Sequence, residues 1–228
     1  MKTNRFLSLV AIFGFALTFT FSCSSGGDSP EGNENPQVYN EDGTLYKGSG
    51  DIIISIDEGS SSGGSGPGSS NRPPFLIAGS VTNGIVKLEL PSTISNDYLY
   101  DFTGFNIIIE QGSCTDYTEN VKIFYAPFGL SNSNGHYTLR FQYDETRERN
   151  GVREGEAGGI LYHYFSKAGK ITCNTFDEEN DNEIVNIDAK VGWNKIYVRA
   201  TWTNGIRTQE WTTKNILTKK DVKWTISK

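Results

Sequence analysis

The alternation of apolar and polar residues around Asn-Gly dipeptides is the clearest pattern in this chain. The dipeptide occurs four times, at 83–84, 134–135, 150–151 and 204–205. Asn-Gly between alternating segments is the strongest short-range signal for a β-hairpin, because both turn residues take a positive φ. No stretch keeps a helical period over a convincing length. The pattern therefore predicts an all-β domain built from hairpins.

The first dipeptide, folded as a two-residue turn, sorts the flanking residues onto an apolar face and a mostly polar face. The apolar pairs are Val81 with Val86, Gly79 with Leu88 and Ile77 with Leu90. The pairs on the other face are Ser80 with Lys87 and Ala78 with Glu89. This separation predicts that the apolar face packs against a core.

The second dipeptide, folded in the same way, also places apolar and polar residues on opposite faces. Its expected apolar pairs are Leu130 with Leu139, Phe128 with Phe141 and Ala126 with Tyr143, while Arg140 and Gln142 lie on the opposite side. Pro127 has no N–H to donate, so we expect it to mark a sheet edge or a bulge.

The fourth dipeptide predicts a less sharply divided hairpin. Its expected pairs are Trp202 with Arg207, Val198 with Trp211, and Arg199 with Glu210 as an exposed ion pair. The core face would carry Ile196, Val198, Ala200 and Trp211. Arg207 is able to lie across the Trp202 ring as a cation on an aromatic face.

Further strand-like runs lie between and after these hairpins, at 105–110, 160–165, 170–175, 184–187 and 222–226. About nine to eleven short strands with frequent turns are typical of a sandwich or a barrel. Because nothing indicates a lumen, we expect an antiparallel β-sandwich over residues 46–228.

An earlier strand-like run, at 51–56, is separated from the hairpins by a Gly/Ser-rich loop at 59–70. The run either docks as an outer strand of the domain or is loosely held. We expect docking, because an exposed run of isoleucines would promote aggregation.

The N-terminus has the layout of a secretory signal. Lys2 and Arg5 precede an apolar run at 6–21, which is shorter than the roughly 20 residues of a spanning helix. A small residue and Cys23 follow. The segment Thr20-Phe21-Ser22-Cys23 resembles the lipobox of bacterial lipoproteins.

That resemblance implies cleavage before Cys23 and acylation of this cysteine. Ser24, rather than an aspartate, follows, which in the lipoprotein family implies the outer membrane, with the domain facing the periplasm or the cell surface. Residues 1–22 are then a lipoprotein signal peptide, and residues 23–45 a flexible tether rich in Ser, Gly, Asn and Pro.

The net charge of the mature chain argues against nucleic acid as a partner. Loss of residues 1–22 removes two basic and no acidic residues, which leaves 19 basic against 27 acidic residues and a formal charge of −8. A chain this acidic is not expected to bind nucleic acid. The richness in Gly, Asn, Thr and aromatic residues favours strands over helices.

Two cysteines, Cys114 and Cys173, remain besides the lipidated one. In an oxidising compartment they could form a disulfide. Two buried free thiols are the alternative, since cysteine is often buried without a partner.

The sequence holds little material for catalysis or for a metal centre. His136 and His163 are the only histidines, and a satisfied or solvated role is expected for both. The acidic run at 177–183 lacks the alternating ligands and central glycine of a calcium loop, so a solvated loop is expected. The Gly-Ser-Ser-Ser-Gly segment at 59–63 matches a nucleophile elbow only formally, because it lies in the linker. We therefore expect no cofactor, no metal and no catalytic residue.

Sugar-binding proteins stack pyranose rings on exposed aromatic side chains, whereas most tryptophans are core residues. Burial is therefore expected for each of the four tryptophans, Trp193, Trp202, Trp211 and Trp224. An exposed pair, Trp202 and Trp211, is the candidate for ligand binding. The two carboxylates of a glycosidase are brought together by the fold and have no fixed spacing in the sequence, so the lack of such a motif does not exclude them.

Two late motifs and one early motif resemble a group of uncharacterised bacterial surface lipoproteins. They are the Gly192-Trp193-Asn194 turn before a late strand, the closing Lys223-Trp224 strand, and the Val81-Thr82-Asn83-Gly84 hairpin that leads to Leu90-Pro91. The resemblance implies a β domain at the cell surface, and no function comes with it.

These observations favour a non-enzymatic lipoprotein that is anchored to the membrane through its lipid and serves adhesion, envelope structure or ligand binding, with a glycan or a protein as its ligand. The alternative is a carbohydrate-binding module or a small glycan hydrolase. An exposed row of aromatic residues, or two carboxylates that face each other in a cleft, would favour the alternative.

Overall fold

The computed structural model describes residues 36–56, 75–101, 113–176, 181–217 and 222–227. It is nearly all β, which confirms the predicted fold class. The strands are β1 Val38–Asn40, β2 Gly50–Ser55, β3 Phe75–Thr82, β4 Ile85–Leu88, β5 Tyr100–Asp101, β6 Ser113–Tyr117, β7 Lys122–Tyr125, β8 Phe128–Asn132, β9 Gly135–Asp144, β10 Arg147–Arg149, β11 Val152–Phe165, β12 Gly169–Phe176, β13 Asp181–Ala189, β14 Gly192–Thr203, β15 Ile206–Thr212 and β16 Lys223–Ser227. One 3₁₀ turn, η1 Asn96–Tyr98, precedes β5. Within the described ranges, no helix has the length and apolarity of a membrane span.

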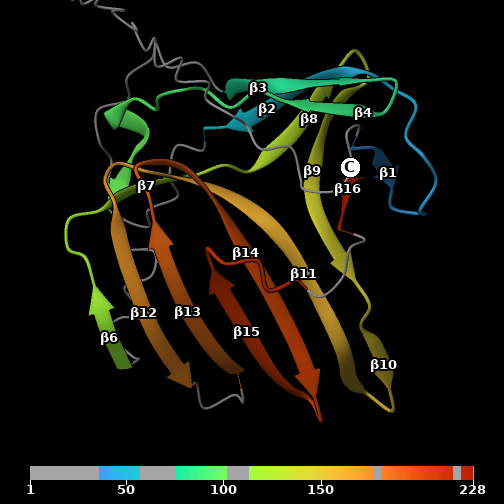
Figure 1. Cartoon of the computed structure of the whole chain (residues 1–228). Helices are drawn as coiled ribbons and strands as arrows, with labels where there is room; N and C mark the ends of the chain where they lie inside the picture. The colour runs from blue at the N-terminus through green and yellow to red at the C-terminus, as the bar shows by residue number, and fades with distance from the viewer. Residues whose placement is uncertain (1–35, 57–74, 102–112, 177–180, 218–221, 228) are drawn as a thin grey trace, which may run out of the picture.

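The strands form one large, mostly antiparallel sheet (Figure 1). Its order is β4-β3-β2-β8-β9-β11-β14-β15-β13-β12-β6, and β16 pairs with both β9 and β1. Two pairings of described strands are parallel, β1 with β16 and β13 with β15. The described residues form sixteen strands rather than the expected nine to eleven. Three of them, β1, β5 and β10, have only two or three residues and show no readable alternation.

Two clusters of buried side chains lie on opposite faces of β11. The first cluster gathers residues of β2, β3, β8, β9 and β16 and includes Tyr162 of β11. The second gathers residues of β12, β13 and β14 and includes Phe165 of β11. Because successive side chains of a strand point to opposite faces, Tyr162 and Phe165 are directed into different layers. This accounts for the sandwich-like packing of a single bent sheet.

One edge of β11 is shared among three shorter strands. β10 pairs with its start, β9 pairs with residues 157–159, and β7 pairs with residues 163–165, while β14 pairs with residues 155–165 along the other edge. β9 then turns away to pair with β8 and β16. The sheet therefore splits along β11 between the contacts made by β9 and β7.

Three of the four Asn-Gly hairpins have the predicted turn. Val81 lies opposite Val86, Val198 lies opposite Trp211, and the two residues that flank the 150–151 turn, Arg149 and Val152, are paired. Asn83, Asn150 and Asn204 have φ of 52°, 53° and 54°, and each following glycine is also positive. The predicted register is confirmed for Val81 with Val86, Gly79 with Leu88 and Val198 with Trp211, and the turn geometry is the reason.

The second hairpin has a different register from the predicted one. Leu130 lies opposite Tyr137, not Leu139, and Asn132 lies opposite Gly135. The turn residues are thus Ser133 and Asn134, with Gly135 at φ 126° just outside the turn. A turn displaced by one residue moves every partner by two, so the side chains stay on their predicted faces.

A bulge on β3 reverses part of the first predicted hairpin face. Ile52 of β2 pairs with Gly79, while the next residue, Ile53, pairs with Ile77, so Ala78 is the extra residue. Ala78 is consequently fully buried, and Ile77 is 53% exposed. Gly79 has a φ of 137°, a conformation that glycine adopts without a steric penalty and that is common beside bulges.

The predicted exposed ion pair of the last hairpin is partly buried. Arg199 Nε donates a hydrogen bond of 2.9 Å to Glu210 Oε2, and Arg199 Nη2 also contacts this oxygen. Arg199 Nη1 donates to the Ile216 carbonyl at 3.2 Å. The segment after β15 therefore folds back over this pair and shields it.

The ordered domain begins earlier than the sequence indicates. β1 lies inside the predicted 23–45 tether, yet it pairs with β16 and buries Val38 completely. β2, the predicted outer strand, docks between β3 and β8, not at an edge. Docking of β2 is expected from its isoleucines, but its central place in the sheet and the order of β1 depend on partners distant in sequence. The 59–70 loop and the predicted 105–110 strand lie outside the described residues.

Candidate functional site

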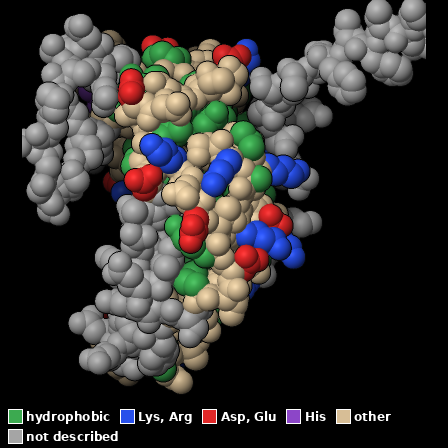
Figure 2. Space-filling model, turned by 90° about the vertical axis from the view of Figure 1, so that its left-hand side faces the viewer, with side chains coloured by type: hydrophobic (Ala, Val, Ile, Leu, Met, Phe, Trp, Pro, Cys, Tyr) green, Lys and Arg blue, Asp and Glu red, His purple; other side chains and the backbone are tan. Residues whose placement is uncertain are grey.

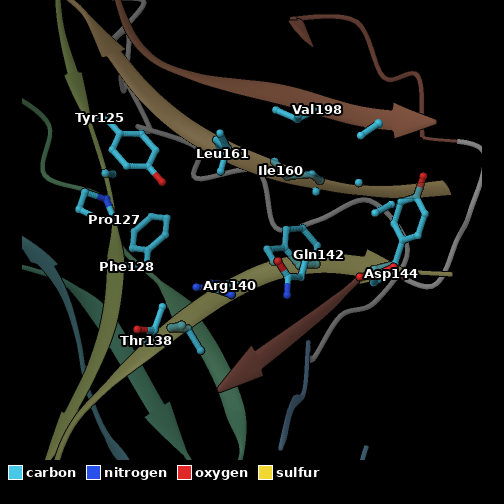
Figure 3. Close-up of a pocket in the computed structure, with 18 residues that line it drawn as sticks. Tyr125, Pro127, Phe128, Thr138, Arg140, Gln142, Asp144, Ile160, Leu161 and Val198 are labelled. Atoms are coloured by element: carbon cyan, nitrogen blue, oxygen red, sulfur yellow. The ribbon is translucent and has the colours of Figure 1, made fainter. Parts of the chain in front are cut away.

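An open groove of about 540 Å³ lies where β9 diverges from β11 (Figure 3). This size falls within the range of about 300–1,000 Å³ that is usual for small-molecule sites. The β9 side carries alternate residues of one strand face, namely Thr138, Arg140, Gln142 and Asp144. The facing wall carries small and apolar residues of β11 and β14, namely Ala157, Gly159, Leu161, Val198 and Ala200.

Strand pairing places the two rows on the same face of the sheet. Gln142 lies opposite Gly159, and Gly159 lies opposite Val198 on the next strand. Gly159 allows this close approach, since a Cβ atom there would lie 2.7 Å from the Phe141 carbonyl oxygen. The groove thus has one polar wall and one apolar wall, joined at the short β9–β11 pairing.

Arg140 is the unneutralised charge of the groove. Its side chain is exposed, and it makes no ion pair or hydrogen bond with any other described residue. Asp144, at the other end of the row, accepts hydrogen bonds from the Thr146 hydroxyl and amide, and Arg153 lies 3.4 Å from its Oδ2. Partial burial opposes ionisation of Asp144, but these hydrogen bonds and the charge of Arg153 keep its pKa below the ordinary value. Asp144 is therefore an ionised, already partnered carboxylate.

The Tyr125 ring stands at the head of the groove. Figure 3 shows its hydroxyl turned toward the space between Phe128 and Leu161. The Tyr125 and His163 rings form a T-shaped pair with 5.2 Å between centroids, and Tyr125 is 39% exposed. Burial raises the pKa of Tyr125, and the positive charge of Arg140 opposes this rise, so the two residues interact electrostatically.

A second exposed tyrosine adjoins the first. Tyr100 on β5 is 46% exposed, and its hydroxyl accepts a hydrogen bond of 2.9 Å from the Tyr125 amide. Tyr100 pairs with Ile123 and therefore shares a sheet face with Tyr125, two residues further along β7. The two rings form a short aromatic row on the face that carries the groove.

His163 is the cross-strand partner of Tyr125 and is buried. Burial lowers its pKa to about 4, so the ring is neutral at physiological pH. Neither ring nitrogen has a hydrogen-bond partner among the described side chains and backbone. His136, the other histidine, is exposed beside the second hairpin turn.

The two tryptophans proposed from the sequence do not line the groove. Trp211 packs against the second core cluster. Trp202 lies under the guanidinium of Arg153, 4.2 Å from the ring centre. The expectation that Arg207 covers Trp202 is wrong, because Arg207 is drawn to Asp181 with a 2.8 Å ion pair on the neighbouring strand β13.

The other two tryptophans serve packing. Trp224 is fully buried and stacks on Phe141 with 4.9 Å between centroids. Trp193 is half-buried, and its Nε1 donates a hydrogen bond of 2.7 Å to the Pro91 carbonyl, which ties the Gly-Trp-Asn turn to the end of the first hairpin. The expected burial therefore holds fully for Trp224 and in part for Trp193.

The two cysteines considered for a disulfide are neighbours in the structure. The Sγ atoms of Cys114 and Cys173 are 2.06 Å apart, at disulfide distance, across the β6–β12 pairing. Cys23 and residues 177–180 lie outside the described part of the chain. Within that part, no group of His, Cys, Asp and Glu side chains could hold a metal ion.

The sequence pattern predicts the polar wall of the groove but not the opposite wall. The alternation around 138–144 separated Arg140 and Gln142 from the core side of β9, and both lie on the groove wall. It gave no sign of the β11 wall or of Tyr125, because the pairing of β11 with β9 and β7 joins distant segments. Pro127, expected at an edge or a bulge, lies between β7 and β8 and lines the groove.

In comparisons with family models, curated proteins and solved structures, nothing matches this chain. The candidate function therefore rests on the geometry of the groove. The face in Figure 2 carries acidic and basic side chains interspersed with hydrophobic ones, without a field of one sign.

Proposed function

We propose that this chain is a non-enzymatic, lipid-anchored protein of the bacterial outer membrane whose β domain binds a small ligand in the β9–β11 groove. The observation that carries the proposal is the pairing of a polar wall with an apolar wall in an open groove. Such mixed lining is usual for ligand sites, where apolar contact supplies affinity and a few polar groups fix orientation.

The titratable groups of the groove favour binding over catalysis. Among the described residues that line it, Asp144 is the sole carboxylate, whereas glycoside hydrolysis uses a pair. Arg140 supplies a guanidinium, which is a hydrogen-bond donor and not an acceptor, so it does not suit the role of a general base. Tyr125 keeps its proton as well, since its pKa is raised by burial.

The proposed membrane anchor is a lipid on Cys23, which follows the apolar run. Cys23 precedes Val38, the first residue of β1, by 15 positions, so an extended tether would hold the domain within about 50 Å of the bilayer. We expect Cys23→Ala to leave the detergent-soluble membrane fraction. Continued recovery of this variant in that fraction would mean that another segment anchors the chain.

The groove is tested by filling it. Gln142→Trp places an indole between the two walls, and His136→Trp adds the same ring on the same face of β9 outside the groove. Both variants and the native chain are heated with a panel of neutral sugars, acidic sugars, amino acids and fatty acids. A ligand at about ten times its Kd stabilises the fold by about 1.4 kcal/mol, which raises Tm by a few degrees.

We expect at least one compound class to raise the Tm of the native chain and of His136→Trp, and to have no effect on Gln142→Trp. Ligand-induced shifts that survive in Gln142→Trp would place binding elsewhere on the molecule. The absence of any shift with the native chain would remove the groove as the functional site.

A further inference from the structure

We infer that the ligand of the groove is an anionic sugar, held by Arg140 at its charge and by Tyr125 at its ring. This inference rests on the proposed function and adds the class of ligand. It is carried by the arrangement of an unpaired cation, a row of hydrogen-bonding side chains and an aromatic ring around one groove.

The charge of the ligand follows from the charges of the wall. Arg140 has no ion-pair partner among the described residues, while Asp144 is held by Thr146 and Arg153. A guanidinium binds carboxylate and sulfate groups through two parallel N–H donors, which makes Arg the usual residue for planar anion recognition. Arg140 is therefore the charged group of the polar wall that is available to a ligand, and it would bind an anion.

The shape of the ligand follows from the ring and the opposite wall. A pyranose has an apolar face of C–H groups and a polar edge of hydroxyls. Tyr125 is 39% exposed and offers part of its aromatic ring to the groove, and Tyr100, 46% exposed, lies beside it on the same sheet face. Leu161 and Val198 offer an apolar wall, and Ala157 and Gly159 add small residues to it.

The polar row matches the hydroxyl edge of such a ring. Thr138 and Gln142 lie on either side of Arg140 on the same face of β9, so consecutive members of the row are two residues apart, or about 7 Å along a strand. A fatty acid would also place a carboxylate at Arg140, but it would leave the Thr138 and Gln142 side chains facing an alkyl chain. Hydrogen-bonding groups that lose water without a new partner cost binding energy, so the row favours a sugar.

The experiment measures Kd for four probes with the full chain in a detergent that carries no sugar headgroup. The probes are galacturonate, galactose 6-sulfate, galactose and octanoate. The two charged sugars distinguish a carboxylate from a sulfate ligand, galactose reports the ring without a charge, and octanoate reports the charge without a ring.

We expect at least one charged sugar to bind about tenfold or more tightly than galactose, and more tightly than octanoate, since a charge-assisted bidentate contact contributes strongly to affinity. Arg140→Gln should abolish the preference for the charged sugar, while Arg140→Lys should retain part of it. Tyr125→Ala should weaken binding of both sugar types about fivefold, and Tyr125→Phe should change it less than about twofold, because the ring supplies the contact.

Two results would overturn the inference. Galactose that binds as tightly as the charged sugars, with no effect of Arg140→Gln, would show that the cation is not used. Octanoate as the tightest ligand would show that the ring is not used. If Gln142→Trp abolishes the binding of galactose or octanoate seen in either case, the native groove binds a ligand and the proposed function stands. If that binding survives in Gln142→Trp, both proposals fail.

Discussion

Arg153 on β11 places its guanidinium 4.2 Å from the centre of the Trp202 ring on β14, and the same guanidinium lies 3.4 Å from Asp144. Arg153 thus joins the far end of the groove row to the hairpin that carries Trp202. This contact occupies one ring face that would otherwise be free for a ligand. It explains why an aromatic residue that looked suited to sugar binding serves packing instead.

Arg153→Ala should lower the free energy of unfolding by about 1 kcal/mol, because an exposed cation–π contact contributes about 0.5–1 kcal/mol and an exposed ion pair adds little. Urea denaturation measures this change. Arg147→Ala, an exposed arginine on β10, is the control and should be neutral within about 0.5 kcal/mol. Equal stability of the two variants would contradict a role for the Arg153 contact.

Trp211→Ala should lower the free energy of unfolding by about 2–3 kcal/mol. Trp211 is the cross-strand partner of Val198 and packs against the second core cluster, so truncation leaves a cavity beside the core. Glu210→Gln, its neighbour on the other face, keeps a hydrogen-bond acceptor for Arg199 and should cost about 1 kcal/mol or less. A near-neutral Trp211→Ala would mean that the indole is exposed and would reopen the tryptophan pair as a ligand site.

Gly79→Ala should destabilise the domain by more than about 2 kcal/mol. The residue has a φ of 137°, and a Cβ atom would lie 2.1 Å from the Lys87 carbonyl oxygen, so the bulge or the β3–β4 pairing must shift. Gly43→Ala is the matched control, since Gly43 also has a positive φ of 80° but open space around it. Its cost should stay near about 1 kcal/mol. Similar losses for both variants would show that conformational strain, not the close approach, decides the effect.

Stability should fall as the pH drops through the range below the ordinary pKa of histidine. The pKa of His163 is lowered to about 4 by burial, so the unfolded chain takes up a proton near pH 6.5 that the folded chain excludes until about pH 4. Stability is therefore complete above about pH 6.5 and is lost below it, by about 2 kcal/mol between pH 7 and pH 5. His163→Phe should remove this part of the pH dependence, and His136→Phe should leave it unchanged. Parallel pH profiles for the native chain and His163→Phe would contradict the burial of a neutral imidazole.

Local signals in the sequence predict the parts of the fold that local physics decides. The Asn-Gly turns at 83–84 and 204–205 set their registers because two residues of positive φ admit one hairpin geometry. The register predicted from the 134–135 dipeptide is wrong because Gly135 lies just outside the turn. The amphipathic faces survive this error, because a slip of two residues preserves alternation.

Long-range pairing decides the rest. The bulge at Ala78 depends on the alignment of β3 with β2, and the two segments are joined through the Gly/Ser-rich loop. The groove depends on β7, β9 and β11 meeting at one point, so Tyr125, Arg140 and Leu161 come together without any common motif. No spacing in the sequence records such a meeting.

The most direct test of the groove is a map of backbone amide chemical shifts in the isotope-labelled chain as galacturonate is added. We predict the largest changes at residues 138–144 of β9 and 157–161 of β11, with no change at the hairpin tips 150–151 and 204–205. The same titration of Gln142→Trp should leave all of these amides unmoved. Changes confined to the hairpin tips, or changes in β9 and β11 that persist in Gln142→Trp, would contradict ligand binding in the β9–β11 groove.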